Sequence, residues 1–209
     1  MKDLTLYFIT DTTDGDTERM CKVVEAACKG GADIIQLREK NISTRDYIHL
    51  AECVLKITKA YNVPLIINDR VDVALASGAD GIHLGQSDMP VDTARKICGP
   101  DMIIGATAKT TEQAKEAYEN GADYLGCGAV YPSSTKKDAA FTPVEKITEV
   151  CNCVPIPVVA IGGLNENNLD ILKGVPVKGM CFVSAIMNDT NPEDKTKTLR
   201  RLAENIISE

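Results

Sequence analysis

The chain has 209 residues, a formal net charge of −7 and 4% aromatic residues, and these values exclude several classes of protein. The length suits one domain, which we expect to span residues 1–209. An acidic chain with few aromatic side chains offers no basic or stacking surface, so nucleic acid is not an expected partner. The sequence contains no signal peptide and no apolar run of about 18 residues, so we expect no membrane span and a cytoplasmic location.

Eight short apolar segments recur along the chain, and their length and aliphatic composition predict buried strands. Longer stretches with mixed polarity separate them. The predicted strands are Leu6–Thr10, Ile34–Leu37, Leu65–Asn68, Gly81–Leu84, Ile103–Ala106, Tyr124–Cys127, Val158–Ile161 and Gly179–Val183.

Amphipathic helices are predicted between these strands, because apolar residues recur at positions i, i+3, i+4 and i+7. Thr110 and Gln113 have the spacing of a capping box at a helix start. The triplet Gly-Ala-Asp occurs at 31–33, 78–80 and 121–123, each time before a predicted strand, and its glycine predicts a helix C-cap. The clearest helical sets are Met20, Val23, Val24 and Ala27; Leu50, Cys53, Val54 and Ile57; and Leu199, Leu202, Ala203 and Ile206.

The eight cysteines are expected to be unpaired. Cys21 and Cys28 lie in a predicted helix, and Cys127 and Cys181 lie within predicted strands. Small buried hydrophobic side chains explain these positions better than disulfides do.

The alternation of strands and helices predicts a parallel sheet, and eight units in this length predict a (β/α)8 TIM barrel. An open, doubly wound sheet is the alternative. The chain lacks the motif G-x-G-x-x-G after the first predicted strand, which removes the main reason to prefer a dinucleotide-binding sheet. In a barrel, the chemistry belongs to the loops that follow the strands.

Two aspartates follow neighbouring predicted strands and indicate a metal site. Asp69 comes directly after Leu65–Asn68, and Asp88 comes shortly after Gly81–Leu84. Both carboxylates should emerge on the same rim of the barrel. Hard oxygen ligands suit Mg²⁺, which keeps coordination positions for water or phosphate oxygens. The alternative is that each aspartate only caps the following helix.

An amide and two cations follow the second predicted strand. Gln36, Arg38 and Lys40 alternate with Leu37 and Glu39, so they should point to the same side while the chain stays extended. This arrangement predicts a site that binds an anion. A surface network of ion pairs with Glu39 is the alternative.

A hydroxyl-rich segment follows the sixth predicted strand. Ser133, Ser134 and Thr135 precede Lys136. Hydroxyl and backbone N–H groups can bind one phosphate while a lysine neutralises another. A solvated loop is the alternative for this segment.

Small residues follow the last two predicted strands. Gly162 and Gly163 come after Val158–Ile161, and Ser184 comes after Val183. Barrels often bind a substrate phosphate at this place, because glycine lets backbone amides approach it and a helix N-terminus adds positive charge. A tight turn is the alternative for the glycine pair.

These residues together predict two anion sites in a barrel enzyme. A diphosphate would lie near Arg38, Lys40, Lys136 and Mg²⁺, and a monophosphate near Gly163 and Ser184. Two phosphorylated small-molecule substrates are therefore expected. A diphosphate held by a metal and cations is a good leaving group, so the predicted chemistry is displacement of pyrophosphate.

Seven segments, in this order and across nearly the whole chain, resemble thiamine-phosphate synthases. They are LYFITD, GGADIIQLREK, IINDRVDVALASGADGIHLGQSDMP, IGATAKT, GADYLGCGAVYPSSTKKD, VPVVAIGG and FVSAI. The resemblance implies a (β/α)8 barrel transferase that uses Mg²⁺. Its reaction joins 4-amino-2-methyl-5-hydroxymethylpyrimidine diphosphate to 4-methyl-5-(2-phosphoethyl)thiazole and yields thiamine phosphate and pyrophosphate.

The resemblance also implies roles for individual residues. Asp69 and Asp88 would hold Mg²⁺. Residues contacting the pyrimidine diphosphate would be Gln36, Leu37, Arg38, Glu39, Lys40, Asn68, Thr107 and Lys136, with catalytic roles for Arg38, Lys40, Thr107 and Lys136. Residues holding the thiazole phosphate would be Ser133, Ser134, Thr135, Gly163, Val183 and Ser184.

Two other readings stay open. A thiazole tautomerase relative, or a regulatory relative that only binds thiazole phosphate, would share the barrel and the phosphate site. Either should lack part of the set Arg38, Lys40, Asp69, Asp88 and Lys136, which is intact here. Thr107 stands where the family often has serine, which keeps the hydroxyl. His83 is expected to line the barrel interior, and the sequence leaves open whether the protein is a homo-oligomer.

Overall fold

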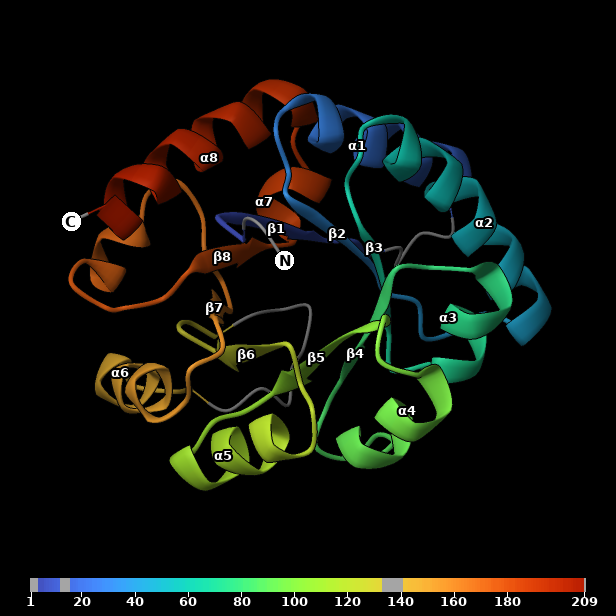
Figure 1. Ribbon diagram of the computed structural model, residues 1–209. Helices are drawn as coiled ribbons and strands as arrows, with labels where there is room; N and C mark the ends of the chain where they lie inside the picture. Colours follow the sequence, from blue (N-terminus) through green and yellow to red (C-terminus); the bar gives the residue numbers. More distant parts are fainter. Residues whose placement is uncertain (1–3, 12–15, 133–140, 209) are drawn as a thin grey trace.

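The computed structural model describes residues 4–11, 16–132 and 141–208. These residues form eight parallel strands that close into a barrel in chain order, from β1 to β8. Helices surround the barrel, and α8 packs beside α1 so that the ring closes at both layers (Figure 1). The predicted (β/α)8 barrel is confirmed, and the open doubly wound sheet is excluded by the pairing of β1 with β8.

Every predicted strand is present, and the ends differ by one residue at most. β1 and β8 end one residue earlier than predicted, whereas β5 and β6 extend one residue further. The strands are β1 (Leu6–Ile9), β2 (Ile34–Leu37), β3 (Leu65–Asn68), β4 (Gly81–Leu84), β5 (Ile103–Thr107), β6 (Tyr124–Gly128), β7 (Val158–Ile161) and β8 (Gly179–Phe182).

The helices occupy the stretches between the strands. None of the helices in the described ranges is both long and apolar enough to cross a bilayer. Their bounds are α1 (Thr17–Lys29), α2 (Thr44–Ala60), α3 (Val71–Ser77), α4 (Val91–Cys98), α5 (Thr111–Glu119), α6 (Val144–Cys153), the 3₁₀ helix η1 (Leu169–Leu172), α7 (Ser184–Met187) and α8 (Pro192–Ser208).

The predicted helix faces are largely the buried ones. All four predicted residues of α1 are buried, as are three of the four in α8. In α2 the buried face also includes Tyr47, Ala51 and Leu55, while Cys53 and Ile57 are only half-buried. The α2 stripe is wider than predicted because this helix packs against α1 and α3 as well as against the strands.

The side chains of the strands separate into two cores, as the alternation along a strand requires. Outward side chains such as Leu37 pack against the helices. Inward side chains, including Tyr7, Ile66 and Tyr124, fill the barrel interior. The eight cysteines are free within the described part of the chain, and Cys28, Cys127 and Cys181 are buried.

The three Gly-Ala-Asp triplets join each helix to the strand that follows. Gly31, Gly78 and Gly121 have positive φ angles of 94°, 69° and 96°, as expected for glycines that end helices. The aspartate of each triplet then accepts a hydrogen bond from a backbone N–H of the preceding strand. The pairs are Asp33 with Leu6, Asp80 with Leu65 and Asp123 with Ile104, at 2.8–3.0 Å. Each triplet therefore fixes a helix end and a strand start together.

We predict that Asp80→Ala lowers the free energy of unfolding by about 1–3 kcal/mol, because it leaves the N–H of the buried residue Leu65 without its acceptor. Urea denaturation measures this change. Asp101→Ala, in an exposed loop, is the matched control and should change stability by less than about 0.5 kcal/mol. Equal stability of the two variants would contradict the proposed role of the triplet.

A candidate active site at the carboxyl ends of the strands

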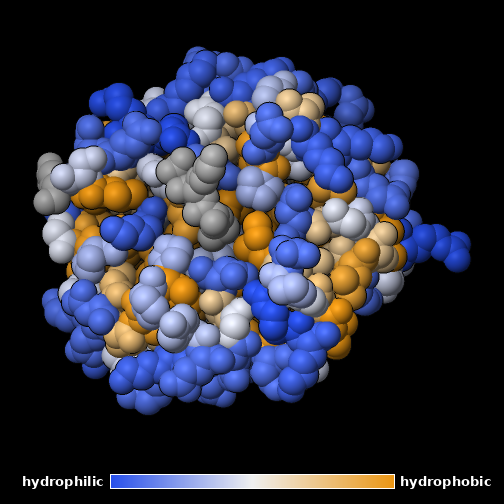
Figure 2. Space-filling model, in the orientation of Figure 1, coloured by the Kyte–Doolittle hydropathy of each residue, from blue (hydrophilic) through white to orange (hydrophobic). Residues whose placement is uncertain are grey.

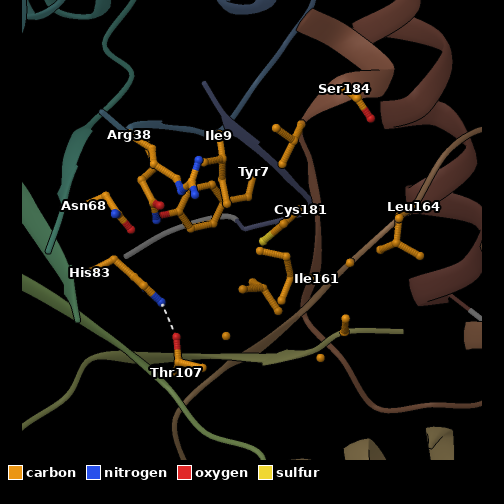
Figure 3. Close-up of a pocket in the computed structure, with 18 of the residues that line it drawn as sticks. Tyr7, Ile9, Arg38, Asn68, His83, Thr107, Ile161, Leu164, Cys181 and Ser184 are labelled. Carbon is orange, nitrogen blue, oxygen red and sulfur yellow. Dashed lines mark hydrogen bonds between the residues drawn. The ribbon is translucent and has the colours of Figure 1, made fainter. Parts of the chain in front are cut away.

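A cavity opens at the carboxyl ends of the strands, the end of a barrel where active sites lie. Its walls mix apolar and polar side chains contributed by strands around the whole barrel. In Figure 3, Asn68 and His83 lie on one side of the cavity, and Ser184, at the start of α7, lies on the other. Around it, hydrophilic side chains cover most of the outer rim of the molecule in the view of Figure 2.

Several predicted site residues line this cavity. They are Gln36, Arg38, Asn68, Thr107, Gly163, Val183 and Ser184. The cavity lining does not include Leu37, Glu39, Lys40, Asp69 or Asp88. The predicted residues Ser133, Ser134, Thr135 and Lys136 lie outside the described residues.

The strand geometry explains the placement of the residues after β2. Leu37 is fully buried among the helices, and its carbonyl accepts a hydrogen bond of 2.8 Å from the Tyr47 hydroxyl. Gln36 and Arg38, on either side of it, face the cavity. Lys40, further along, is exposed. The predicted alternation therefore brings two of the three polar side chains to the cavity wall.

Arg38 is a fixed cation at the mouth of the cavity. Its backbone N–H donates to the Thr10 hydroxyl at 3.1 Å, and its guanidinium Nη1 lies 3.2 Å from Oδ1 of Asp11. Only 14% of the side chain is exposed. An arginine held in this way can present its remaining N–H groups to an anion with little loss of conformational entropy.

Lys109 is a cavity cation that the sequence analysis missed. It follows Thr107 by two residues, so both side chains lie on the same side of an extended segment. Its backbone N–H donates to the side chain of Gln113 at 2.8 Å, within the turn that starts α5. The predicted cap of this helix is present, because the Thr110 hydroxyl accepts the N–H of Gln113. The same alternation that identified Arg38 could have identified Lys109.

The two aspartates proposed as metal ligands lie at the ends of neighbouring strands. Asn68 pairs with His83 across β3 and β4, and the next N–H, that of Asp69, donates to the carbonyl of His83 at 2.9 Å. Asp69 has a φ of 62°, a left-handed conformation that aspartate tolerates better than most residues. This conformation turns the chain sharply at the rim.

Asp88 returns to the same rim through a tight turn. Its carboxylate Oδ2 accepts the N–H of Gly85 at 2.6 Å, and its own N–H donates to the carbonyl of Gly85 at 3.1 Å. The carboxylate is thereby held at the end of β4, beside the end of β3. No group of three or more acidic, histidine or cysteine side chains gathers for a metal within the described residues. Two carboxylates with open positions fit Mg²⁺, which retains water ligands, better than they fit a fully protein-bound ion.

The loop after β7 is built around two glycines. Gly162 and Gly163 have φ angles of 114° and 62°, and a Cβ on Gly163 would lie 2.8 Å from Cβ of Tyr131. The side-chain amides of Asn168 and Asn165 donate to the carbonyl of Gly163 at 2.9 and 3.3 Å. These bonds fix the peptide plane between Gly163 and Leu164, both of which line the cavity.

A chain of hydrogen-bonded side chains crosses the floor of the cavity. Gln36 donates to the Tyr7 hydroxyl at 2.8 Å, and the Tyr7 and Tyr124 hydroxyls lie 2.7 Å apart. The Tyr124 hydroxyl lies 3.0 Å from Nδ1 of His83, and Nε2 of His83 lies 3.0 Å from the Thr107 hydroxyl. Figure 3 shows this last contact as a dashed line. His83 lines the interior as predicted.

The two tyrosines were missed because tyrosine in a strand counts as an apolar core residue in a sequence pattern. Burial raises the pKa of Tyr7 and of Tyr124 well above the ordinary value. Both hydroxyls therefore keep their protons and act as neutral hydrogen-bonding groups. Their inward positions in β1 and β6 were the available signal.

Comparison with known proteins identifies the family. The thiamine monophosphate synthase family matches residues 6–186. The chain is 46% identical to thiamine-phosphate synthase 2 of Streptococcus pneumoniae, over 98% of both chains. It is 47% identical to the thiamine-phosphate synthase of Methanobrevibacter smithii, over 94% of both chains.

Solved structures agree with the sequence comparisons. A thiamine phosphate pyrophosphorylase from Pyrococcus furiosus superposes with a TM-score of 0.86 at 38% identity, covering 98% of this chain and 97% of that one. The 3-keto-gulonate-type barrel described as KGPDC from Streptococcus mutans, at 15% identity and a TM-score of 0.74, shares the fold alone. With a matched family spanning most of the barrel and close relatives over nearly their full length, the chain belongs to the thiamine monophosphate synthase family.

Proposed function

We propose that this protein is a thiamine-phosphate synthase. It would join 4-amino-2-methyl-5-hydroxymethylpyrimidine diphosphate to 4-methyl-5-(2-phosphoethyl)thiazole, with release of pyrophosphate. The observation that carries the proposal is the identity of 46–47% to thiamine-phosphate synthases over at least 94% of the chain. Both substrates carry phosphate charges that do not cross a bilayer, so we place the reaction in the cytoplasm.

The pyrimidine diphosphate would lie on the side of the cavity formed by β2 to β5. Gln36, Arg38, Asn68 and Thr107 line this side, and Lys109 adds a second cation. Charge accumulates on the diphosphate as its C–O bond breaks, so cations fixed beforehand bind the departing group more tightly than the substrate. Lys136, from the hydroxyl-rich segment of the sequence, would add to this stabilisation.

Asp69 and Asp88 would hold Mg²⁺ at the adjoining rim. A bound Mg²⁺ would neutralise the diphosphate and make it a better leaving group. The protein's own contribution is to keep two carboxylates on one rim through the backbone bonds of Asp69 to His83 and of Asp88 to Gly85.

The thiazole phosphate would lie on the opposite side, at the loops after β7 and β8. Gly163, Leu164, Val183 and Ser184 line this side. The absence of a side chain at Gly163 lets a phosphate oxygen approach the backbone. The asparagines that bind the Gly163 carbonyl keep the following N–H of Leu164 in a fixed direction.

The apolar wall between the two sides suits an electron-poor intermediate. Loss of pyrophosphate would leave a pyrimidine-methyl cation, stabilised by the amino group of the ring, and the thiazole nitrogen would form the new C–N bond. Water would compete for this cation. Apolar side chains exclude it from the space between the substrates; they are Ile9, Val159, Ile161 and Val183.

A product assay tests the function. Pure protein incubated with both substrates and Mg²⁺ should form thiamine phosphate and pyrophosphate in equal amounts. A tautomerase would instead convert thiazole carboxylate phosphate without any pyrimidine diphosphate, and a regulatory relative would bind thiazole phosphate without forming product. Absence of pyrophosphate from the complete mixture would overturn the proposal.

We predict that Asp69→Asn and Asp88→Asn raise the Mg²⁺ concentration needed for half-maximal turnover by at least about 10-fold, because each removes one carboxylate charge from the metal site. Both substitutions keep an acceptor oxygen, so the backbone turns should persist. Asp101→Asn, in an exposed loop, is the control. Unchanged Mg²⁺ dependence in both site variants would show that the metal binds elsewhere.

We predict that Gly163→Ala raises the KM for thiazole phosphate by about 10-fold or more, while the KM for pyrimidine diphosphate stays within about 2-fold. A methyl group here would meet Tyr131 and the phosphate approach at once. Gly78→Ala is a matched control, because Gly78 has a similar φ of 69° with no atom within 4 Å of the added Cβ. A selective rise in the pyrimidine KM would mean that the two sites are reversed.

A further inference from the structure

The hydrogen-bonded chain on the cavity floor joins two residues of the proposed pyrimidine site. It starts at Gln36 on β2 and ends at Thr107 on β5, and it passes through Tyr7, Tyr124 and His83. Tyr7 and Tyr124 are 1% and 0% exposed. In such a dry setting, an unmatched donor or acceptor is costly, so each proton should point toward an acceptor.

The direction of the first link follows from chemistry. The amide nitrogen of Gln36 can only donate, so the oxygen of Tyr7 accepts. The single proton of Tyr7 must then go to its remaining partner among the described residues, the oxygen of Tyr124. Tyr124 accepts there, and its own proton goes to Nδ1 of His83.

The same reasoning fixes the state of the histidine. A ring nitrogen that accepts a proton from Tyr124 carries none itself, so the neutral ring of His83 is protonated on Nε2. Nε2 then donates to the oxygen of Thr107. With its oxygen accepting from His83, the Thr107 hydroxyl has its own proton available to donate into the cavity that it lines.

We propose that this one-directional chain makes Tyr7, Tyr124 and His83 positioning residues that keep the Thr107 hydroxyl as a donor toward the diphosphate. The proposal rests on the proposed function for the identity of the acceptor, but the direction of the chain is a property of the free protein. The chain also leaves the carbonyl oxygen of Gln36 as an acceptor, suited to an amino group on the bound ring.

The geometry of the barrel supports a dedicated arrangement. A Cβ on Gly105 would lie 2.1 Å from Cζ of Tyr124, and a Cβ on Gly126 would lie 3.2 Å from Cε1 of His83. Two neighbouring strands thus carry glycine where the two rings need space. The rings of Tyr7 and Tyr124 lie 5.8 Å apart, and those of His83 and Tyr124 lie 5.5 Å apart, so the side chains support one another.

The tautomer of His83 can be measured directly by ¹⁵N NMR of the imidazole nitrogens in the free protein. The chain has two histidines, and His49→Gln, at an exposed position, assigns the spectrum. In the wild type, Nε2 of neutral His83 should carry the proton and Nδ1 should not. A proton on Nδ1 of the neutral ring would overturn the proposal.

Gln36→Glu reverses the chain at its far end. An ionised carboxylate accepts from Tyr7 and cannot donate, so Tyr7 should accept from Tyr124, and Tyr124 from His83. Nδ1 of His83 should therefore become protonated. Tyr7→Phe removes the directing link with a smaller change and should give a mixture of tautomers. If Nδ1 stays unprotonated in both variants, the chain does not set the tautomer.

The link to turnover is tested by a double-mutant cycle. Thr107→Val should lower kcat/KM for pyrimidine diphosphate by about 10–100-fold, the effect of losing one hydrogen bond to a charged group. Thr107→Ser should restore most of the activity. Tyr124→Phe alone should lower the same constant by about 5-fold, but by less than about 2-fold when Thr107→Val is already present, because it acts through Thr107.

Tyr61→Phe is the control for removal of a hydroxyl. Its hydroxyl binds Glu25 at 3.0 Å, at the C-terminal end of α2 and away from the cavity lining, and its kinetics should match the wild type. Full additivity of Tyr124→Phe and Thr107→Val would overturn the proposed coupling. Failure of the proposed function would instead appear as a wild type without turnover, and the NMR result would still decide the direction of the chain.

Discussion

The limited space inside an eight-stranded barrel is the constraint on which the site depends. Tyr124 reaches across the interior only because Gly105 on the neighbouring strand has no side chain, since a Cβ there would lie 2.1 Å from the ring. The hydroxyl of Tyr124 thereby meets both Tyr7 and His83. The floor of the cavity is polar and fully hydrogen-bonded, while the layers below it are closed by aliphatic side chains. Packing of the barrel and arrangement of its polar groups are therefore one problem.

The mouth of the barrel separates two kinds of anion-binding chemistry. The side formed by β2 to β5 carries fixed charges: Arg38 is held by Asp11, and two aspartates are held at the rim by backbone bonds. The side formed by β7 and β8 relies on backbone, with glycines at positive φ and asparagine side chains that orient a peptide plane. A diphosphate with a metal suits the first side, and a monophosphate suits the second.

Periodicity along the chain was enough to predict the barrel, every strand and the inward positions of Gln36 and Arg38. It could not reveal contacts that depend on closure of the barrel. Tyr7 and Tyr124 are 117 residues apart in sequence, and each is an ordinary apolar strand residue until the two strands face each other. The partner of Arg38 lies 27 residues earlier, on a neighbouring strand. The pairing of Asp80 with Leu65 was likewise hidden, although the triplet that contains Asp80 was recognised as a helix end.

The central claim is that one cavity holds two anions on opposite sides, and backbone amide NMR tests it most directly. Pyrophosphate with Mg²⁺ should shift the amide resonances of Arg38, Gly85 and Asp88, whereas thiazole phosphate should shift those of Gly163, Leu164 and Ser184. Each ligand should still produce its own shifts when the other is present at saturation. If the two ligands shift the same set of amides and displace each other, the protein has one anion site and the account is wrong.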